Sequence, residues 1–124
     1  MDKTVLIVED QDDLRLLIRL TLKRFGRVVA SADATAVPAL VAAERPDIVV
    51  LDVWLGAAIS GLDICRELKR DAMAPKVVVL SACGQQSDID AGIAAGADMY
   101  IVKPFSPEGL ESAVATLLAA PRPL

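Results

Sequence analysis

Four short, largely aliphatic runs of the sequence are each followed directly by side chains that could do chemistry. In chain order, these side chains belong to Glu9, Asp10, Asp52, Ser81 and Lys103. Together they suit the transfer of a phosphoryl group to a carboxylate, in which Asp52 would attack phosphorus and form an acyl phosphate. Lys103 would neutralise charge on the transferring oxygens, and the Ser81 hydroxyl would donate a hydrogen bond to one of them.

The aliphatic runs predict the strands that position these groups. Residues 48–51 are four consecutive branched aliphatics without alternation, which is typical of a strand covered on both faces in a parallel sheet. Val28–Ala30 is a further, shorter run that is expected to form an edge strand. Segments with helical periodicity separate the five runs, so that strand and helix alternate five times with short connections. We therefore expect one α/β domain over residues 1–124. Its sheet should be doubly wound, five-stranded and parallel, of the flavodoxin-like (βα)5 type with strand order 2-1-3-4-5.

The predicted strand order brings three carboxylates to one edge of the sheet. The first and third strands are neighbours in that order, so Glu9, Asp10 and Asp52 would meet beyond their carboxyl ends. At about 4 Å and an effective dielectric constant of about 20, two carboxylates repel each other by about 4 kcal/mol, and Lys103 alone cannot balance three of them. A divalent cation would resolve this repulsion. Because every candidate ligand is an oxygen atom, the sequence favours Mg²⁺ over zinc or copper.

Composition narrows the classes of function. The chain has 124 residues, a net charge of −4 and no histidine, which excludes histidine-based acid–base chemistry and a phosphohistidine step within the chain. Without a basic tract it is not expected to bind nucleic acid by itself, and Arg15, Arg19 and Lys23 are interpreted as a solvated helix stripe. Cys65 and Cys83 are too far apart for a CxxC pair, and no disulfide is expected. No stretch is suited to a membrane span or a signal peptide, so we expect a cytoplasmic protein.

The helix expected after Asp10 has one inward face and two leucines outside it. Asp12 or Asp13 is expected to cap this helix. The inward face, at spacings of three and four residues, is predicted to hold Leu14, Leu17, Ile18, Thr21 and Phe25. Leu16 and Leu20 fall outside this face, near the acidic site.

A fourth helix is predicted to be short and weak. Ser87 and Asp90 have the spacing of a capping box at its start. Gly92 lies in its interior, where glycine costs about 1 kcal/mol relative to alanine. We therefore expect this helix to be an element that moves when the protein changes state.

Four motifs in this order resemble the receiver domain of two-component response regulators and are similar to the stand-alone chemotaxis regulators. The motifs are Val8-Glu9-Asp10, Leu51-Asp52, Leu80-Ser81-Ala82 and Tyr100-Ile101-Val102-Lys103-Pro104-Phe105, and the resemblance runs from about Thr4 to Leu118. It implies that Asp52 accepts the phosphoryl group and that Lys103 binds phosphate. It also implies Mg²⁺ at Asp10 and Asp52, with Glu9 acting through water and the backbone carbonyl of Trp54 as a further ligand.

The resemblance also implies a switch and a set of partners. Ser81 matches the switch hydroxyl and Tyr100 the switch aromatic. The phosphodonor would be a sensor histidine kinase or a histidine phosphotransfer protein, docking on the helix that carries Leu16 and Leu20. We expect no output domain after the last predicted helix, and therefore either an unknown downstream protein target or a role as a phosphoryl sink.

Three features depart from the pattern of the family. Gly56 stands where proline is usual, and the segment from Asp52 to Gly61 is one residue longer than usual. Trp54 is bulky for a position beside the phosphoryl group: it either slows attack by water or a phosphatase, or packs sideways without effect.

Two rival functions are open. A flavin-binding module would use the same fold, but the anionic segment after residue 8 disfavours it. An unphosphorylated scaffold is disfavoured by the complete set of site residues.

Overall fold

Five parallel strands form one sheet. The computed structural model describes residues 3–52 and 61–120. The strands are β1 (Lys3–Val8), β2 (Gly26–Ser31), β3 (Ile48–Asp52), β4 (Lys76–Ser81) and β5 (Met99–Val102). Their order in the sheet is β2-β1-β3-β4-β5, and every neighbouring pair is parallel. The strand order expected from the sequence is therefore confirmed.

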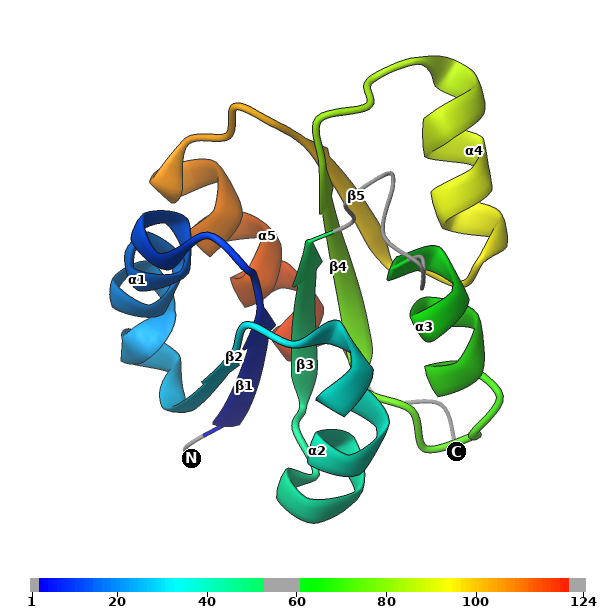
Figure 1. The fold of residues 1–124 in the computed structure, drawn as a ribbon. Coiled ribbons are helices and arrows are strands. Elements are labelled where there is room, and N and C mark those ends of the chain that lie inside the picture. The colour runs from blue at the N-terminus through cyan, green and yellow to red at the C-terminus, as the bar shows by residue number, and fades with distance from the viewer. Residues whose placement is uncertain (1–2, 53–60, 121–124) are drawn as a thin grey trace.

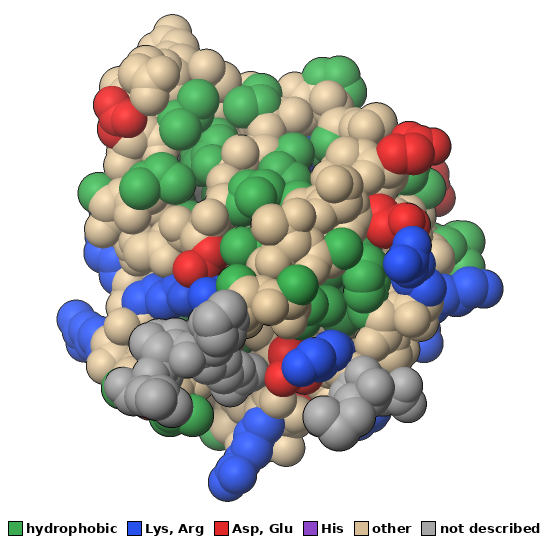
Figure 2. All heavy atoms as spheres, turned by 180° about the vertical axis from the view of Figure 1, so that it is seen from behind, with side chains coloured by type: hydrophobic (Ala, Val, Ile, Leu, Met, Phe, Trp, Pro, Cys, Tyr) green, Lys and Arg blue, Asp and Glu red, His purple; other side chains and the backbone are tan. Residues whose placement is uncertain are grey.

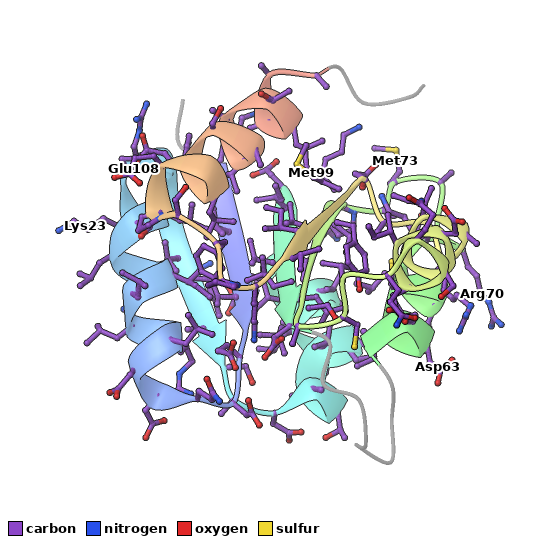
Figure 3. All side chains as sticks on the ribbon, turned by 90° about the horizontal axis from the view of Figure 1, so that it is seen from above. Lys23, Asp63, Arg70, Met73, Met99 and Glu108 are labelled. Carbon is purple, nitrogen blue, oxygen red and sulfur yellow. The ribbon has the colours of Figure 1, made fainter. Side chains whose placement is uncertain are left out.

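Helices cover both faces of the sheet (Figure 1). In the described part of the chain they are α1 (Asp12–Leu22), α2 (Val37–Glu44), α3 (Gly61–Leu68), α4 (Gln86–Ala94) and α5 (Pro107–Ala119), with short 3₁₀ turns at Lys23–Phe25 and Ala34–Ala36. Helices α1 and α5 pack on one face, α2 and α3 pack on the other, and α4 lies beside β5. Figure 3 shows these layers from above, with the charged side chains of Lys23 and Arg70 pointing outward.

The interior consists largely of branched aliphatic side chains from the three central strands. Residues 5–8, 48–51 and 77–80 are all buried, with exposed fractions of 3% or less. Successive residues face opposite sides of the sheet, so Val5 packs with α1 and α5, whereas Leu6 packs with α2 and α3. Burying one such side chain stabilises the fold by about 1.5–3 kcal/mol. The runs without alternation are therefore strands covered on both faces, as predicted.

Helix α1 buries a narrower face than the sequence predicted. Ile18 and Leu22 are fully buried, whereas Leu17, which was expected to point inward, is 42% exposed. Side chains four residues apart lie on the same face of a helix, so the line through Ile18 and Leu22 leaves Leu17 at its margin. Leu16 and Leu20 lie outside this line, as expected, with exposed fractions of 56% and 53%.

The predicted caps of two helices are wrong. Gln11 is the N-cap residue of α1, and the two aspartates that follow it lie in the first turn. Helix α4 begins with a capping box, but Gln85 and Asp88 form it, in place of the predicted Ser87 and Asp90. Glutamine is not among the preferred N-cap residues, so the sequence pattern did not indicate either position.

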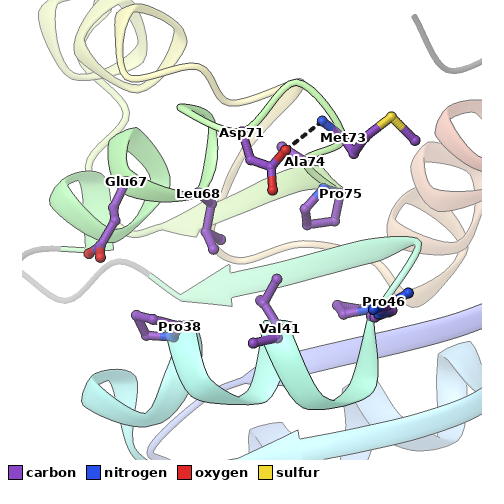
Figure 4. Close-up of a pocket in the computed structure, with 11 residues that line it drawn as sticks. Pro38, Val41, Pro46, Glu67, Leu68, Asp71, Met73, Ala74 and Pro75 are labelled. Atoms are coloured by element: carbon purple, nitrogen blue, oxygen red, sulfur yellow. Dashed lines mark hydrogen bonds between the residues drawn. The ribbon is translucent and has the colours of Figure 1, made fainter. Parts of the chain in front are cut away.

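A groove of about 660 Å³ lies between α2 and α3, away from the ends of the strands where the predicted site residues meet (Figure 4). Its lining includes Val41, Leu68, Pro46 and Pro75. The two prolines precede β3 and β4, which places the groove at the amino ends of these strands. The groove is therefore separate from the site described below.

Candidate functional site

The carboxyl ends of β1 and β3 bring three carboxylates together. Val8 pairs with Leu51 in the sheet, so the residues that follow them, Glu9 and Asp52, are neighbours at its edge. Carboxylate oxygens of Glu9, Asp10 and Asp52 all lie within 4.8 Å of one another. The structure thus assembles the acidic cluster that the strand order predicted.

Glu9 is a charged side chain in a buried position, with an exposed fraction of 1%. Its Oε2 accepts a hydrogen bond from the Gln11 N–H at 3.1 Å, whereas its Oε1 is buried and has no hydrogen-bond donor within residues 3–52 and 61–120. Burial is the largest cause of a raised pKa of about 7 for Glu9, and the neighbouring Asp52 carboxyl raises this pKa further, against the Gln11 N–H, which lowers it. Additional positive charge at this position would stabilise the ionised form of Glu9.

Lys103 forms ion pairs with the acidic cluster. Its Nζ lies 2.8 Å from Asp52 Oδ1 and 3.5 Å from Glu9 Oε1. The backbone N–H of Lys103 donates to the Ser81 carbonyl at 2.8 Å, which joins the end of β5 to the end of β4 and places the side chain over the site. Burial lowers the pKa of Lys103, but the Asp52 and Glu9 carboxylates raise it more, so the net pKa lies above its ordinary value and the lysine stays charged.

Ser81 lies at the end of β4, next to Asp52. Leu80 pairs with Asp52 in the sheet, and Ser81 follows it with an exposed fraction of 1%. Ser81 Oγ accepts a hydrogen bond from the Cys83 N–H at 3.0 Å, and no acceptor for its hydroxyl proton is found within residues 3–52 and 61–120. The Tyr100 hydroxyl donates to the Cys83 carbonyl at 2.7 Å. The two predicted switch residues therefore contact the same residue, one through its N–H and the other through its carbonyl.

Sequence reasoning missed the role of Arg15, which it assigned to a solvated stripe. The Arg15 side chain is 24% exposed, and its Nη1 donates to the Glu9 carbonyl at 2.9 Å. Its Nη2 pairs with Asp12 at 2.6 Å. Arg15 thus ties α1 to the turn that carries Glu9 and Asp10. A helix-stripe pattern contains no signal for a contact with a backbone carbonyl.

The donor set of the cluster fits a hard divalent cation. All three side chains offer oxygen ligands, and among the described residues three carboxylates outnumber the one ammonium group that pairs with them. Within the described residues, the buried Oε1 of Glu9 has the ion pair with Lys103 at 3.5 Å but no hydrogen-bond donor, which supports the same interpretation. The predicted backbone ligand, Trp54, lies outside the described residues.

Comparison with known proteins decides the family. The family model of the response regulator receiver domain matches residues 5–115. The chain belongs to the response regulator receiver family. This receiver is 36% identical over 117 residues to the probable transcriptional regulator ycf27 of Cyanophora paradoxa, which covers 94% of this chain and 48% of that protein. It is 34% identical over 119 residues to the phosphate regulon transcriptional regulatory protein PhoB of Pseudomonas aeruginosa, covering 94% of this chain and 52% of PhoB. The receiver thus spans about half the length of the curated relatives it matches.

Solved receivers share the architecture. The BeF3-activated receiver domain of DrrB from Thermotoga maritima superposes with a TM-score of 0.86 at 31% identity, covering 97% of this chain and 100% of that one. A second response regulator from Thermotoga maritima gives a TM-score of 0.85 at 26% identity with the same coverage. The flavodoxin-like fold predicted from the sequence is confirmed. Within residues 3–52 and 61–120, no helix is both long and apolar enough to cross a membrane.

Proposed function

We propose that this receiver accepts a phosphoryl group on Asp52 and signals to a protein partner through a conformational switch. The observation that carries the proposal is the surroundings of Asp52. Lys103 Nζ lies 2.8 Å from its carboxylate, and oxygens of Glu9 and Asp10 lie within 4.8 Å. Three carboxylates in close contact repel one another, and the partly buried Lys103 balances only one of the three charges. Membership of the receiver family supports a metal and a phosphoryl group as the further ligands of this site.

Mg²⁺ is the proposed cofactor. Asp10 and Asp52 would hold the ion directly, Glu9 would act through a bound water, and the backbone carbonyl of Trp54 is proposed as a further ligand on the strength of the family resemblance. When bound, Mg²⁺ neutralises charge on the carboxylates and on the oxygens of the phosphoryl group.

The groups of the chain itself account for the transfer. An Asp52 oxygen attacks phosphorus while the P–N bond of a donor phosphohistidine, or the P–O bond of acetyl phosphate, breaks and the bonding electrons leave with the donor atom. Lys103 orients the carboxylate beforehand and then faces the oxygens of the acyl phosphate. The Ser81 hydroxyl proton is available for one of those oxygens. Catalysis by this signalling protein would be limited to its own phosphorylation and dephosphorylation.

The loop after β4 is proposed to change conformation when Asp52 is phosphorylated. Ser81 and Tyr100 both form hydrogen bonds with the backbone of Cys83. A phosphoryl oxygen that accepts the Ser81 hydroxyl proton would therefore change the positions of the loop, the Tyr100 ring and α4 together. Ile93 of α4 and Val102 of β5 are 51% and 37% exposed and are proposed to contact the partner. Figure 2 shows hydrophobic side chains reaching the surface on the side opposite to the view of Figure 1.

The proposed partners are proteins. A sensor histidine kinase or a histidine phosphotransfer protein would deliver the phosphoryl group by docking on α1, where Leu16 and Leu20 are exposed. The downstream partner is a protein of unknown identity. We propose a single receiver domain over residues 1–124 that acts in the cytoplasm without contacting nucleic acid or membrane itself, although the two relatives above are named transcriptional regulators.

Phosphorylation by acetyl phosphate in the presence of Mg²⁺ tests the proposal. Intact mass should show one phosphate adduct on the wild-type chain. Asp52→Asn keeps the shape of the side chain but lacks the nucleophilic oxygen pair, so it should gain no adduct. Chelation of Mg²⁺ should abolish the adduct on the wild type. An adduct on Asp52→Asn equal to that of the wild type would rule out Asp52 as the acceptor.

A further inference from the structure

Gly92 of α4 faces the ring of Tyr100 with no room for a side chain. A Cβ atom at residue 92 would lie 2.5 Å from Cδ2 and 2.8 Å from Cε2 of the Tyr100 ring. Carbon atoms in van der Waals contact are about 3.5–4.0 Å apart, so a methyl group and the ring cannot hold these positions together. Glycine is unfavourable inside a helix relative to alanine, and here the buried Gly92 has a packing reason.

We propose that Gly92 is a positioning residue whose missing side chain forms the seat in which the Tyr100 ring lies. This inference rests on the switch role proposed above for Tyr100. In the seat, the ring packs against Gly92 while its hydroxyl donates to the Cys83 carbonyl at 2.7 Å. The Cys83 N–H in turn donates to Ser81 Oγ at 3.0 Å. A chain of direct contacts thus joins α4 to the hydroxyl beside Asp52.

The seat gives α4 a direct means of controlling the ring. Ile93 follows Gly92 on the helix and is 51% exposed, so a partner that binds there contacts the residue next to the seat. A shift of α4 toward the sheet would close the seat, and a ring in the seat would limit that shift. By thermodynamic linkage, the free energy by which partner binding shifts the ring equals the free energy by which the ring position changes partner affinity. Gly92→Ala should hold the ring out of the seat whether or not Asp52 carries a phosphoryl group.

Fluorine NMR of the ring tests the seat directly. Tyr100 is the only tyrosine of the chain, so incorporation of 3-fluorotyrosine gives a signal from this ring alone. In the unphosphorylated Gly92→Ala chain we expect a shifted resonance that a soluble paramagnetic agent broadens more than it broadens the wild-type resonance. An unchanged shift with unchanged broadening would overturn the proposal, because the methyl group would then fit without moving the ring.

Urea denaturation of paired variants separates the seat from a general effect on α4. Alanine favours a helix more than glycine does, so Gly92→Ala should raise the unfolding midpoint in a Tyr100→Ala background, where no ring competes for the space. The same change should lose this gain in the wild-type background and in Tyr100→Phe, which keeps the ring but lacks the hydroxyl. Equal gains in all three backgrounds would contradict a steric seat.

Phosphorylation is scored on the same proteins by intact mass. Gly92 lies in α4 and is none of the residues proposed to hold the metal or the phosphoryl group, so Gly92→Ala should gain the same adduct from acetyl phosphate as the wild type. Absence of the adduct from both proteins would contradict the proposed function, while the fluorine result would still decide the seat. An adduct on both proteins with an unmoved ring would contradict the seat alone.

Discussion

Glu9 should make the stability of the metal-free protein fall as the pH rises. Burial, followed by the neighbouring Asp52 carboxyl, raises the pKa of Glu9 to about 7 from an ordinary value of 4.5. The folded chain therefore binds the Glu9 proton more tightly than the unfolded chain does, and ionisation between these two values favours unfolding. One pH unit between the two pKa values is worth about 1.4 kcal/mol, so ionisation of Glu9 lowers the free energy of unfolding by about 3 kcal/mol over this range.

Glu9→Gln removes this ionisation and keeps the size of the side chain. At about pH 8 we expect Glu9→Gln to be more stable than the wild type by about 3 kcal/mol, and near about pH 4.5 we expect most of this difference to vanish. Urea unfolding in the presence of a chelator across this range measures it. Glu108→Gln, which removes an exposed carboxyl in the first turn of α5, is the matched control and should follow the wild type. Parallel pH profiles for Glu9→Gln and the wild type would refute the burial argument.

Magnesium should restore the stability that the protein loses when Glu9 ionises. An ion held by Asp10 and Asp52 favours the ionised form of Glu9, and a ligand at about 100 times its Kd adds about 2.7 kcal/mol to the free energy of unfolding. Protons compete with the ion for the same carboxylates, so the gain should be larger at about pH 8 than at about pH 5. A gain that does not depend on pH would contradict the assignment of these carboxylates to the metal.

Three further changes probe the phosphodonor surface, the switch and the metal. Leu16→Ser should slow transfer from the cognate kinase by a factor of about 10–100, because burial of one leucine in a contact is worth about 1.5–3 kcal/mol, and should spare phosphorylation by acetyl phosphate. Equal slowing with both donors would indicate a folding defect. Ser81→Ala should still accept phosphate but give only part of the amide NMR shifts of residues 82–100 with beryllofluoride. One hydrogen bond to a charged group is worth about 1.5–3 kcal/mol, whereas a full population shift needs about 5.5 kcal/mol; full shifts would exclude the hydroxyl from the switch. The emission of Trp54, the only tryptophan, should change on Mg²⁺ titration of the wild type but not of Asp10→Ala, and a flat wild-type titration would contradict the proposed ligand geometry.

The acidic cluster could be predicted from the sequence because its position depends on strand order. Glu9 and Asp52 each follow a run of aliphatic residues, and such runs form neighbouring central strands when the sheet is doubly wound. Lys103 was predictable for the same reason, since it follows β5. Periodicity was less informative on α1, where the inward line runs through Ile18 and Leu22 and leaves Leu17 exposed.

Two contacts between neighbouring elements could not be predicted. The hydrogen bond from Arg15 to the Glu9 carbonyl depends on the path of the turn between β1 and α1. Gly92 indicated only a weak helix in the sequence, and its packing against Tyr100 depends on how α4 lies beside β5. Local patterns contain propensity and periodicity, whereas these contacts arise from the tertiary arrangement.

The most direct test of the proposed function is to locate the phosphoryl group on the chain. Borohydride reduces an aspartyl phosphate to homoserine, so peptide mass spectrometry after treatment with acetyl phosphate, Mg²⁺ and borohydride identifies the modified residue. We expect homoserine at residue 52 of the wild-type chain and at no other position, because Asp52 is the carboxylate that Lys103 orients at 2.8 Å. Homoserine at residue 10, or equal modification of the Asp52→Asn variant, would contradict the assignment of Asp52 as the phospho-acceptor.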